Sequence, residues 1–528
     1  MFDKKTLLVG LLSFATVLGI QVLFRQWFAA PTSELSVQTG GSYTIPLPSA
    51  TDLARPAQKN LSFDEAVAAH DAHMLTVSTS LYEATFTTVG GTLDSLMLLP
   101  VPAIADRAMP LVVPAAVPDH ASYIVACDEH SPLHYRLDEH TKQSDGSQVV
   151  RFSARYHDWQ ISKTFTLYPD TYRIELTLAF KTSARHPAPL RPRLFVAAPR
   201  SADATKDKPT AVVFDAAKGA LNTDISDVQR TTDAWVQPSI IGGQTLYCAQ
   251  VLYADTQGFV QRGYFTAADA GSVSAILEGP TLTDAAAYTL SFYAGPKNLE
   301  TLAAVDERLE GLLNFGFLSW LVKWLLRLLD HIYDLVHNYG IAIMLLTMLL
   351  RLLLMPFSLR GMKYMEQQQR LQPRVAGLRK KYAHDTAMFN AELMKLYQEH
   401  GVSPAGPLIG CLFMLPQWPI FFAMYRLAGA VQLHHAPFFG WITDLSAKDP
   451  YYVLPALVIA LTFMQPFSMG GEEGDSRTRM MRFVMPLLLS AMFVGMPAVV
   501  LLFLVVNFSF SLFEQRIRAL LSRRGARA

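Results

Sequence analysis

Long apolar runs in the second half of the sequence constrain what this chain can become. Residues 339–357, 408–430, 451–467 and 482–513 are apolar almost throughout. A straight helix needs about 20 apolar residues to cross a bilayer. The chain is 51% hydrophobic and only 17% charged, whereas soluble domains carry about 25% charged residues. These features predict a membrane protein rather than a soluble one.

The last of these runs is too long for a single helix. The sequence Gly495-Met496-Pro497 lies near its middle, and glycine and proline favour a turn. We therefore expect two short spans, one on each side of this turn. The spans 451–467 and 482–495 are shorter than usual, so we also expect the bilayer to be thinner beside them.

Residues 6–28 form another apolar segment, preceded by Lys4 and Lys5. A cleavable signal peptide is the alternative, but its apolar region would cover about 7–15 residues and end in small residues. Here the run is longer, and Phe28 would occupy position −3 of a cut after Ala30. We expect an uncleaved anchor over residues 1–30, which makes six transmembrane helices in total.

The composition and the pattern of apolar residues change after the anchor. Its start is rich in proline, serine, threonine and glycine, which predicts a linker over residues 31–74. Residues 75–298 then alternate between apolar and polar positions. Residues 159–168 and 172–180, for example, flank a turn, which is typical of a β-hairpin. Many such short strands predict an all-β sandwich.

The three cysteines and the net charge exclude some functions. The sequence has no Cys/His spacing typical of a metal site, so no metal or cofactor is expected. Cys127 and Cys248 either pair or remain two inert thiols, and Cys411 lies in an apolar run. A net charge of +1 gives no chain-wide field for nucleic acid, and we expect no specific DNA partner.

Residues 299–336 carry leucine, tryptophan and phenylalanine at helical spacing, with charged residues such as Lys323 between them. Trp320 and Trp324 are typical of a helix that lies in the membrane interface rather than crossing it. The alternative is a helix packed on the β-sandwich. The remainder, residues 337–528, is predicted to be a membrane core of five helices.

Basic residues predict the direction of these spans. The loop 358–402 holds eight basic and four acidic residues, and the tail after residue 513 holds five arginines. The loop 434–450 holds only Lys448 as a basic residue. Because basic loops stay in the cytoplasm, both termini are expected there, with the β domain on the other side. Two amphipathic segments, with Asp385 as N-cap of the second, predict a helical hairpin over 358–402.

Arg351 interrupts the run 339–357 close to its cytoplasmic end. An arginine there costs several kcal/mol if it faces lipid. It either extends to the headgroups, pairs with an acid on a neighbouring span, or faces a hydrated cavity. The runs 408–430, 451–467 and 482–513 contain no aspartate or glutamate, so the sequence offers no counter-ion within them. We predict a guanidinium in a hydrated cavity open to the cytoplasm.

Few other polar residues interrupt the spans. Thr347, Gln417, Gln465 and Asn507 are each typical of contacts between helices, and together with Arg351 they predict a hydrophilic groove. The sequence contains no GxSxG, HExxH or GxxxxGK[ST] motif. Hydrolase and nucleotide-driven activities therefore have no support.

The segment Gly340 to Arg351, followed by Met355-Pro356, resembles the arginine-bearing span of the YidC family of membrane protein insertases. Further similar motifs occur in the hairpin, in the following spans and in the β domain. They are Leu371-Gln372-Pro373, Leu396-Tyr397, residues 417–425, residues 441–451, Gly90-Gly91 and Gly295-Pro296-Lys297. Ser403-Pro404 and Pro497-Ala498-Val499 depart from the family's usual residues.

The resemblance implies an insertase of the long Gram-negative form, located in the inner membrane, and not an enzyme. Such a protein moves hydrophobic segments of nascent membrane proteins from a cytoplasm-open groove into lipid, alone or with the Sec translocon. The resemblance also implies that the hairpin and basic tail engage the ribosome and the signal recognition particle receptor. In this family the periplasmic sandwich resembles sugar mutarotases.

Two other function classes remain open at this point. A polar-solute transporter would explain one intramembrane arginine, although the sequence shows no inverted repeat or paired broken helices. A sugar-binding or mutarotase-like activity would place the function in residues 75–296.

Overall fold

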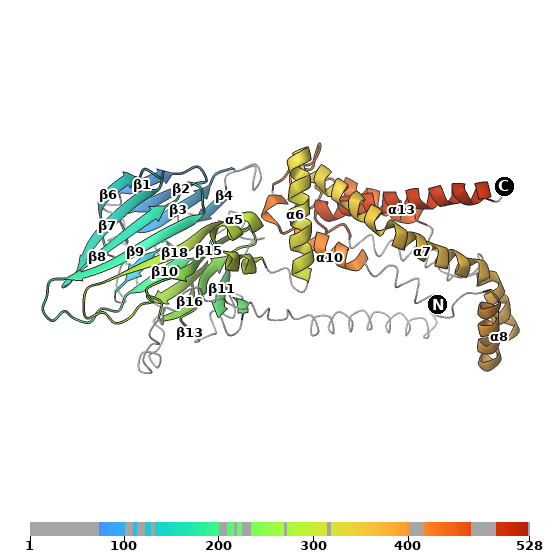
Figure 1. Ribbon diagram of the computed structural model, residues 1–528, viewed down its shortest axis with the longest axis horizontal. Coiled ribbons are helices and arrows are strands. Elements are labelled where there is room, and N and C mark those ends of the chain that lie inside the picture. Colours follow the sequence, from blue (N-terminus) through green and yellow to red (C-terminus); the bar gives the residue numbers. More distant parts are fainter. Residues whose placement is uncertain are drawn as a thin grey trace. The chain divides into compact units, whose positions relative to one another are not determined.

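A computed structural model describes most of the chain from residue 73 onward (Figure 1). The described residues are 73–100, 109–112, 122–127, 133–199, 209–215, 219–223, 234–268, 272–313, 318–400, 417–433, 435–465 and 493–525. They form two compact units, which meet in sequence between Phe317 and Leu318. The expected anchor and nearly all of the expected linker lie outside the described residues.

The described residues of the first unit form three antiparallel sheets. One has the order β1-β2-β3-β4, formed by Met74–Ser78, Tyr82–Thr87, Thr92–Leu98 and Met109–Val112. The second has the order β13-β16-β17-β10-β5, formed by Trp235–Val236, Arg262–Ala268, Ser272–Glu278, Arg193–Ala197 and Ile124–Ala126. The third has the order β12-β11-β14-β15-β18-β9-β8-β7-β6, formed by Gly219–Thr223, Thr210–Asp215, Ile240–Gln244, Cys248–Asp255, Ala286–Pro296, Arg173–Thr182, Trp159–Leu167, Gln148–Tyr156 and Arg136–Lys142.

Alternating burial along the strands explains how these sheets pack. In β8 and β9 every second side chain is buried, because successive side chains of a strand point to opposite faces. Buried residues of the nine-stranded and five-stranded sheets, such as Phe292 and Leu277, belong to one apolar core. The predicted β-rich domain is confirmed, and the predicted hairpin is β8 paired with β9. No disulfide joins Cys127 to Cys248.

A buried lysine joins separate parts of this domain. Lys163 points from β8 into the core and is 0% exposed. Its ammonium group donates to the carbonyl oxygens of Gly90 at 2.6 Å, Gly91 at 3.2 Å and Tyr123 at 2.7 Å. Gly90 and Gly91 both have positive φ, which lets the turn present both carbonyls to the lysine. Burial lowers the pKa of Lys163 well below its usual range, while the three acceptors favour the charged form.

The segment that follows the strands differs from its prediction. The expected single interfacial helix over 299–336 is divided into α5 (Leu299–Val305), the 3-10 helix η2 (Glu307–Leu312) and α6 (Ser319–Val336). Asp306 is extended between the first two, and its carboxylate accepts the N–H of Arg308. Leu302 and Leu309 are buried in the core of the β domain. The interfacial prediction is therefore wrong for the part up to η2, where the packing alternative holds.

The second unit is helical. Besides α6 it contains α7 (Tyr339–Lys381), α8 (Thr386–Glu399), α10 (Gln417–Leu427), η4 (Val431–Leu433), α11 (Val453–Met464) and α13 (Ala498–Gly525). The segments Tyr339–Pro356 of α7 and Ala498–Arg516 of α13 are long and apolar enough to cross a membrane, and α11 is a shorter apolar helix. Of the other predicted spans, residues 408–416 and most of 482–495 lie outside the described residues.

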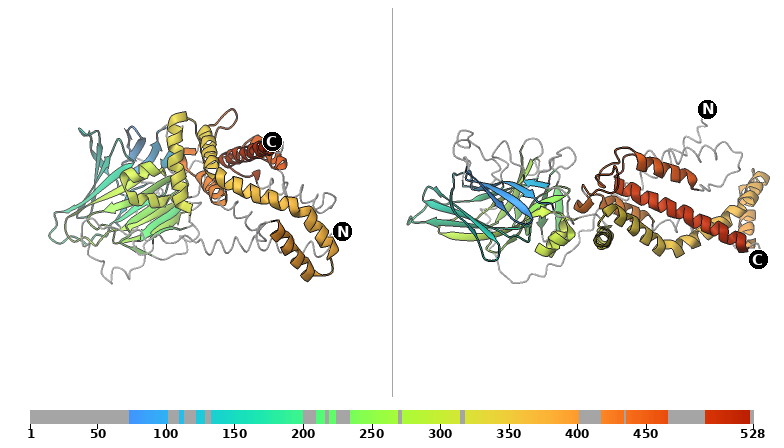
Figure 2. Two further views of the ribbon diagram at one scale, coloured as in Figure 1. Left: turned by 45° about the vertical axis from the view of Figure 1, so that its right-hand side comes forward. Right: turned by 90° about the horizontal axis from the view of Figure 1, so that it is seen from above.

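The first span and the hairpin are more continuous than expected. The sequence predicted a helix boundary near residue 358, but α7 runs through 43 residues and includes Pro356 and Pro373. Proline removes one backbone donor and bends a helix without always ending it, and Figure 1 shows α7 bending along its second half. The hairpin forms as predicted: Asp385 caps α8 by accepting the N–H groups of Ala387 and Met388, and α8 turns back beside the end of α7 (Figure 2).

The loop over residues 435–452 holds the beginnings of three helices together. The buried Asp449 accepts the indole N–H of Trp441 at 3.0 Å and the N–H of Leu454, in the first turn of α11, at 2.6 Å. Loop carbonyls accept the first N–H groups of α13. These bonds join Ala498 N to Ala447 O at 2.7 Å and Val499 N to Leu445 O at 3.0 Å. The first residues of α13, which directly follow the predicted turn at Gly495-Met496-Pro497, are thus hydrogen-bonded to this loop.

The same loop closely approaches α7 at Gly340, which allows a test. A Cβ atom at Gly340 would lie 1.9 Å from Phe438 Cδ2, so Gly340→Ala must displace the loop. We expect a loss of about 1–3 kcal/mol in unfolding free energy. The matched control is Gly377→Ala in the same helix, where nothing lies within 4 Å and helix propensity favours alanine by about 1 kcal/mol. Thermal unfolding of both variants in detergent checks this, and equal midpoints would contradict the packing.

Candidate functional site

Helices α7 and α13 run parallel and share polar contacts. Arg351 binds Asn507, and two helical turns further on Ser358 binds Glu514. Each pair is 156 residues apart in sequence. Two helices whose contacts keep a constant sequence offset run in the same direction, as Figure 1 also shows. We call the line of contact between them the α7–α13 seam.

Three helices meet at Asn507. The Nε atom of Arg351 donates to Asn507 Oδ1 at 2.6 Å, and Nη2 donates to the main-chain oxygen of Asn507 at 3.2 Å. Gln417 of α10 donates to the same Oδ1 atom at 3.1 Å. Asn507 is only 4% exposed, whereas Arg351 and Gln417 are half-buried. The structure thus brings together three of the five residues predicted from the sequence.

Thr347 lies one turn before Arg351 but does not join this cluster. Its hydroxyl donates to the main-chain oxygen of Ile343 at 2.7 Å, the local bond that threonine often makes inside a helix. The side chain is buried. Its predicted role as a groove residue has no hydrogen bond to support it.

Gln465 belongs to a second polar cluster. Its amide donates to the main-chain oxygen of Phe508 at 3.1 Å, and its Oε1 atom accepts from Ser511 at 3.3 Å and Gln515 at 3.0 Å. These contacts lie further along α13 than Asn507, and none of them involves Arg351, Asn507 or Gln417. Gln465 therefore joins α11 to α13 rather than contacting Arg351. The groove predicted as one set of five is divided into two clusters.

Glu514 was missed by the sequence analysis. It lies one residue beyond the apolar run 482–513, but α13 continues and buries it to 3% exposure. Its carboxylate accepts from the hydroxyl of Ser358 at 3.3 Å and attracts the charge of Arg351 electrostatically. The sequence offered no counter-ion within the three apolar runs, and Glu514 lies just outside the last of them. The helical spacing of Asn507 and Glu514, seven residues apart, was the signal that could have found it.

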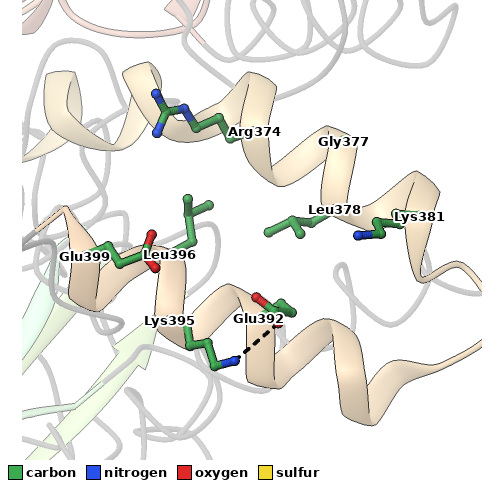
Figure 3. A pocket seen from close by; sticks show the side chains of 8 residues that line it. All are labelled: Arg374, Gly377, Leu378, Lys381, Glu392, Lys395, Leu396 and Glu399. Atoms are coloured by element: carbon green, nitrogen blue, oxygen red, sulfur yellow. Dashed lines mark hydrogen bonds and ion pairs between the residues drawn. The ribbon is translucent and has the colours of Figure 1, made fainter.

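A cleft of roughly 350 Å³ lies between the end of α7 and α8. It is lined by basic, acidic and apolar side chains from both helices, as Figure 3 shows. Lys395 and Glu392 form an ion pair at 3.4 Å, and Leu378 and Leu396 lie across the gap between the helices. Met388 and Met394 are exposed, so these two methionines do not pack the hairpin against itself.

Comparison with known proteins identifies the family. The sequence matches the family described as "60Kd inner membrane protein" over residues 331–521 and the "YidC periplasmic domain" over residues 74–328. The membrane protein insertase YidC of Syntrophus aciditrophicus (strain SB) is 30% identical over 97% of this chain and 98% of that protein. The chain belongs to the YidC family of membrane protein insertases.

Two further proteins show similarity to this chain. The YidC insertase of Geotalea daltonii (strain DSM 22248 / JCM 15807 / FRC-32) is 42% identical over 41% of this chain and 40% of that protein. A solved structure titled "Active YidC insertase crystal structure with the first transmembrane domain resolved" is 20% identical, covers 84% of this chain and 92% of that chain, and has a TM-score of 0.37. The resemblance found in the sequence is confirmed: the protein is a membrane protein insertase acting on nascent membrane proteins, and not an enzyme.

The parallel packing of the α7–α13 seam can be tested by crosslinking. In a chain whose three native cysteines are replaced by serine, Ser358→Cys with Glu514→Cys should form a disulfide under mild oxidation. Ser358→Cys with Asn507→Cys is the control, because its residues lie two turns, about 10.5 Å, apart along the seam, too far for a disulfide. Mass spectrometry of the linked peptides reads out both pairs. A disulfide in the control pair alone would contradict the register.

Proposed function

We propose that Arg351, Asn507 and Gln417 form the polar centre that receives the flank of an inserting segment. The observation that carries this proposal is the position of Arg351 on the membrane-spanning part of α7, half-buried and fixed by Asn507. The two bonds to Asn507 use Nε and Nη2. Among the described residues Nη1 makes no hydrogen bond, which leaves one edge of the guanidinium for a substrate group.

An apolar surface next to this centre suits the segment being inserted. Exposed side chains of α7 include Met348, Leu349, Leu352 and Leu353. A charged flank crossing hydrocarbon costs about 2.5–3.5 kcal/mol per residue on translocon scales. A polar centre part-way across lowers that barrier, while the apolar side chains contact the hydrophobic part of the substrate. The groove opens to the cytoplasm, so that a nascent chain enters from there.

The direction of α7 and α13 supports the proposed topology. Because the two helices cross in the same direction, an odd number of spans must connect them. Helices α10 and α11 account for two, and the apolar residues 482–495 for a third. With the anchor at residues 1–30 this gives six transmembrane helices, both termini in the cytoplasm, and a periplasmic β domain over residues 75–298 on the other side of the inner membrane.

Two further elements adapt the protein to the bilayer in this proposal. Helix α11 has 12 residues, about 18 Å at helical rise, against a hydrocarbon core of about 30 Å. The membrane is therefore thinned beside it, which shortens the path of an inserting segment. Helix α6 lies in the interface, with Trp320 70% exposed and the buried Leu325 and Leu329 on its other side.

The hairpin and the basic tail are the proposed contact points for cytoplasmic partners. Arg374, Lys381 and Lys395 line the hairpin cleft, and basic surfaces attract ribosomal RNA through its phosphates. The signal recognition particle receptor is the second partner of these elements. Insertion proceeds alone or beside the Sec translocon, and the released segments enter the surrounding membrane lipids.

The role of Arg351 predicts a dependence on substrate charge. Arg351→Ala should reduce insertion of a substrate with an acidic translocated tail about tenfold, since a lost interaction of about 1.4 kcal/mol gives that factor. Arg351→Lys should retain much activity because it keeps the positive charge. The measurement is insertion of a small single-span protein, with and without its acidic tail residues, in cells that depend on each variant. Immunoblots control for protein amount.

Equal insertion of both substrates by the wild-type protein and Arg351→Ala would contradict this role. It would favour an arginine that merely extends toward the headgroups.

A further inference from the structure

The buried carboxylate of Glu514 has no part in the mechanism above, although it lies on the same seam as Arg351. We propose that Glu514 is the internal counter-charge of Arg351, and that it determines how strongly the groove prefers acidic over basic substrate flanks. This inference rests on the proposed role of Arg351 as the group that receives the flank.

The geometry places two acceptors for the guanidinium along the seam. Asn507 holds it in the structure, and Glu514 lies two turns further along the same face of α13. Ser358 of α7 donates to the Glu514 carboxylate at 3.3 Å and so keeps it on the side of α13 that faces α7. The rise along α13 from Asn507 to Glu514 is two turns, about 10.5 Å. The side chains of Arg351 and Glu514 are together long enough to span that distance.

Electrostatics gives this arrangement a function. A charge buried in a membrane protein is costly unless an opposite charge lies close, and Glu514 attracts Arg351 in that way. An incoming carboxylate must therefore compete with Glu514 for the guanidinium. A basic flank is repelled by Arg351 but attracted by Glu514. The seam consequently weakens a preference for acidic flanks that the arginine alone would impose.

Glu514 also lies nearer than Asn507 to the basic end of α13, which the proposed topology places in the cytoplasm. An entering flank meets Glu514 before it reaches Arg351. Acidic flanks are retarded at this point and basic flanks are drawn in, so Glu514 acts as a specificity-determining residue.

The test compares three versions of one single-span substrate, with acidic, neutral and basic tails, inserted into liposomes containing the full-length protein. Glu514→Gln keeps the size of the side chain and its ability to accept from Ser358, but removes the charge. We expect it to raise the ratio of acidic to neutral insertion about three- to tenfold and to lower the ratio of basic to neutral insertion. Unchanged ratios would overturn the proposal.

Matched variants separate charge from packing. Ser358→Ala removes the hydrogen bond but keeps the carboxylate, and should change the ratios less than Glu514→Gln does. Glu300→Gln makes the same change of net charge at an exposed position in the β domain and should leave both ratios at the wild-type values. If Glu300→Gln shifts the ratios as far as Glu514→Gln, a general charge effect replaces the proposal.

The double variant Arg351→Ala/Glu514→Gln shows whether Glu514 acts through the arginine. We expect Glu514→Gln to change the ratios less in the Arg351→Ala background than in the wild-type protein, because only the direct effect of Glu514 on the flank then remains. If Arg351→Ala abolishes selectivity but Glu514→Gln behaves as wild type, the inference on Glu514 fails while the role of Arg351 stands. If Arg351→Ala leaves selectivity intact, the proposed function itself fails. Should Glu514→Gln not accumulate, Glu514→Ala with Ser358→Ala removes the charge without leaving an unmatched buried hydroxyl, and the same ratios decide.

Discussion

The charge of Arg351 in a membrane-spanning helix is the constraint on which the helical unit depends. A guanidinium at that depth is stable only if protein groups, water or an opposite charge replace the hydration it has lost. The α7–α13 seam supplies such groups on one line: the amide and carbonyl of Asn507 and the carboxylate of Glu514. The apolar side chains of both helices hold these groups in place.

The two ends of the α7–α13 seam differ in structure. At the beginnings of α7, α11 and α13, the loop over residues 435–452 provides acceptors for free helix N–H groups and packs Phe438 against Gly340. Such bonds satisfy the donors that every helix start leaves unpaired. At the other end, polar side chains lie along the seam and α7 continues into the hairpin. The proposed topology places the polar end in the cytoplasm, which is the side from which an inserting segment would enter.

The sequence predicted the main features of this site for a simple physical reason. Polar residues are rare in apolar runs, so Arg351, Gln417 and Asn507 could be identified without a structure, and the structure joins them. Gln465 was identified by the same rule but contacts residues further along α13, because hydropathy does not tell which parts of two helices lie side by side. Glu514 was missed because a boundary drawn by hydropathy ends where the first charge appears, whereas the helix does not.

The β domain and the hairpin also show which features a sequence predicts and which it does not. The alternation of apolar and polar residues predicted the strands, and Asp385 predicted the cap of α8. Both effects are local in the sequence. The division of residues 299–336 at Asp306 depends instead on burial of Leu302 and Leu309 by strands far away in sequence. Tertiary packing of this kind overrides a helical pattern.

Photo-crosslinking of a stalled nascent substrate tests the central claim most directly. A photoreactive residue placed within its acidic flank should crosslink to peptides that contain Arg351 and Asn507, and replacing the acidic residues of the flank should reduce these crosslinks severalfold. Crosslinks confined to the exposed apolar face of α7 around Leu353, and independent of the charge of the flank, would contradict the account.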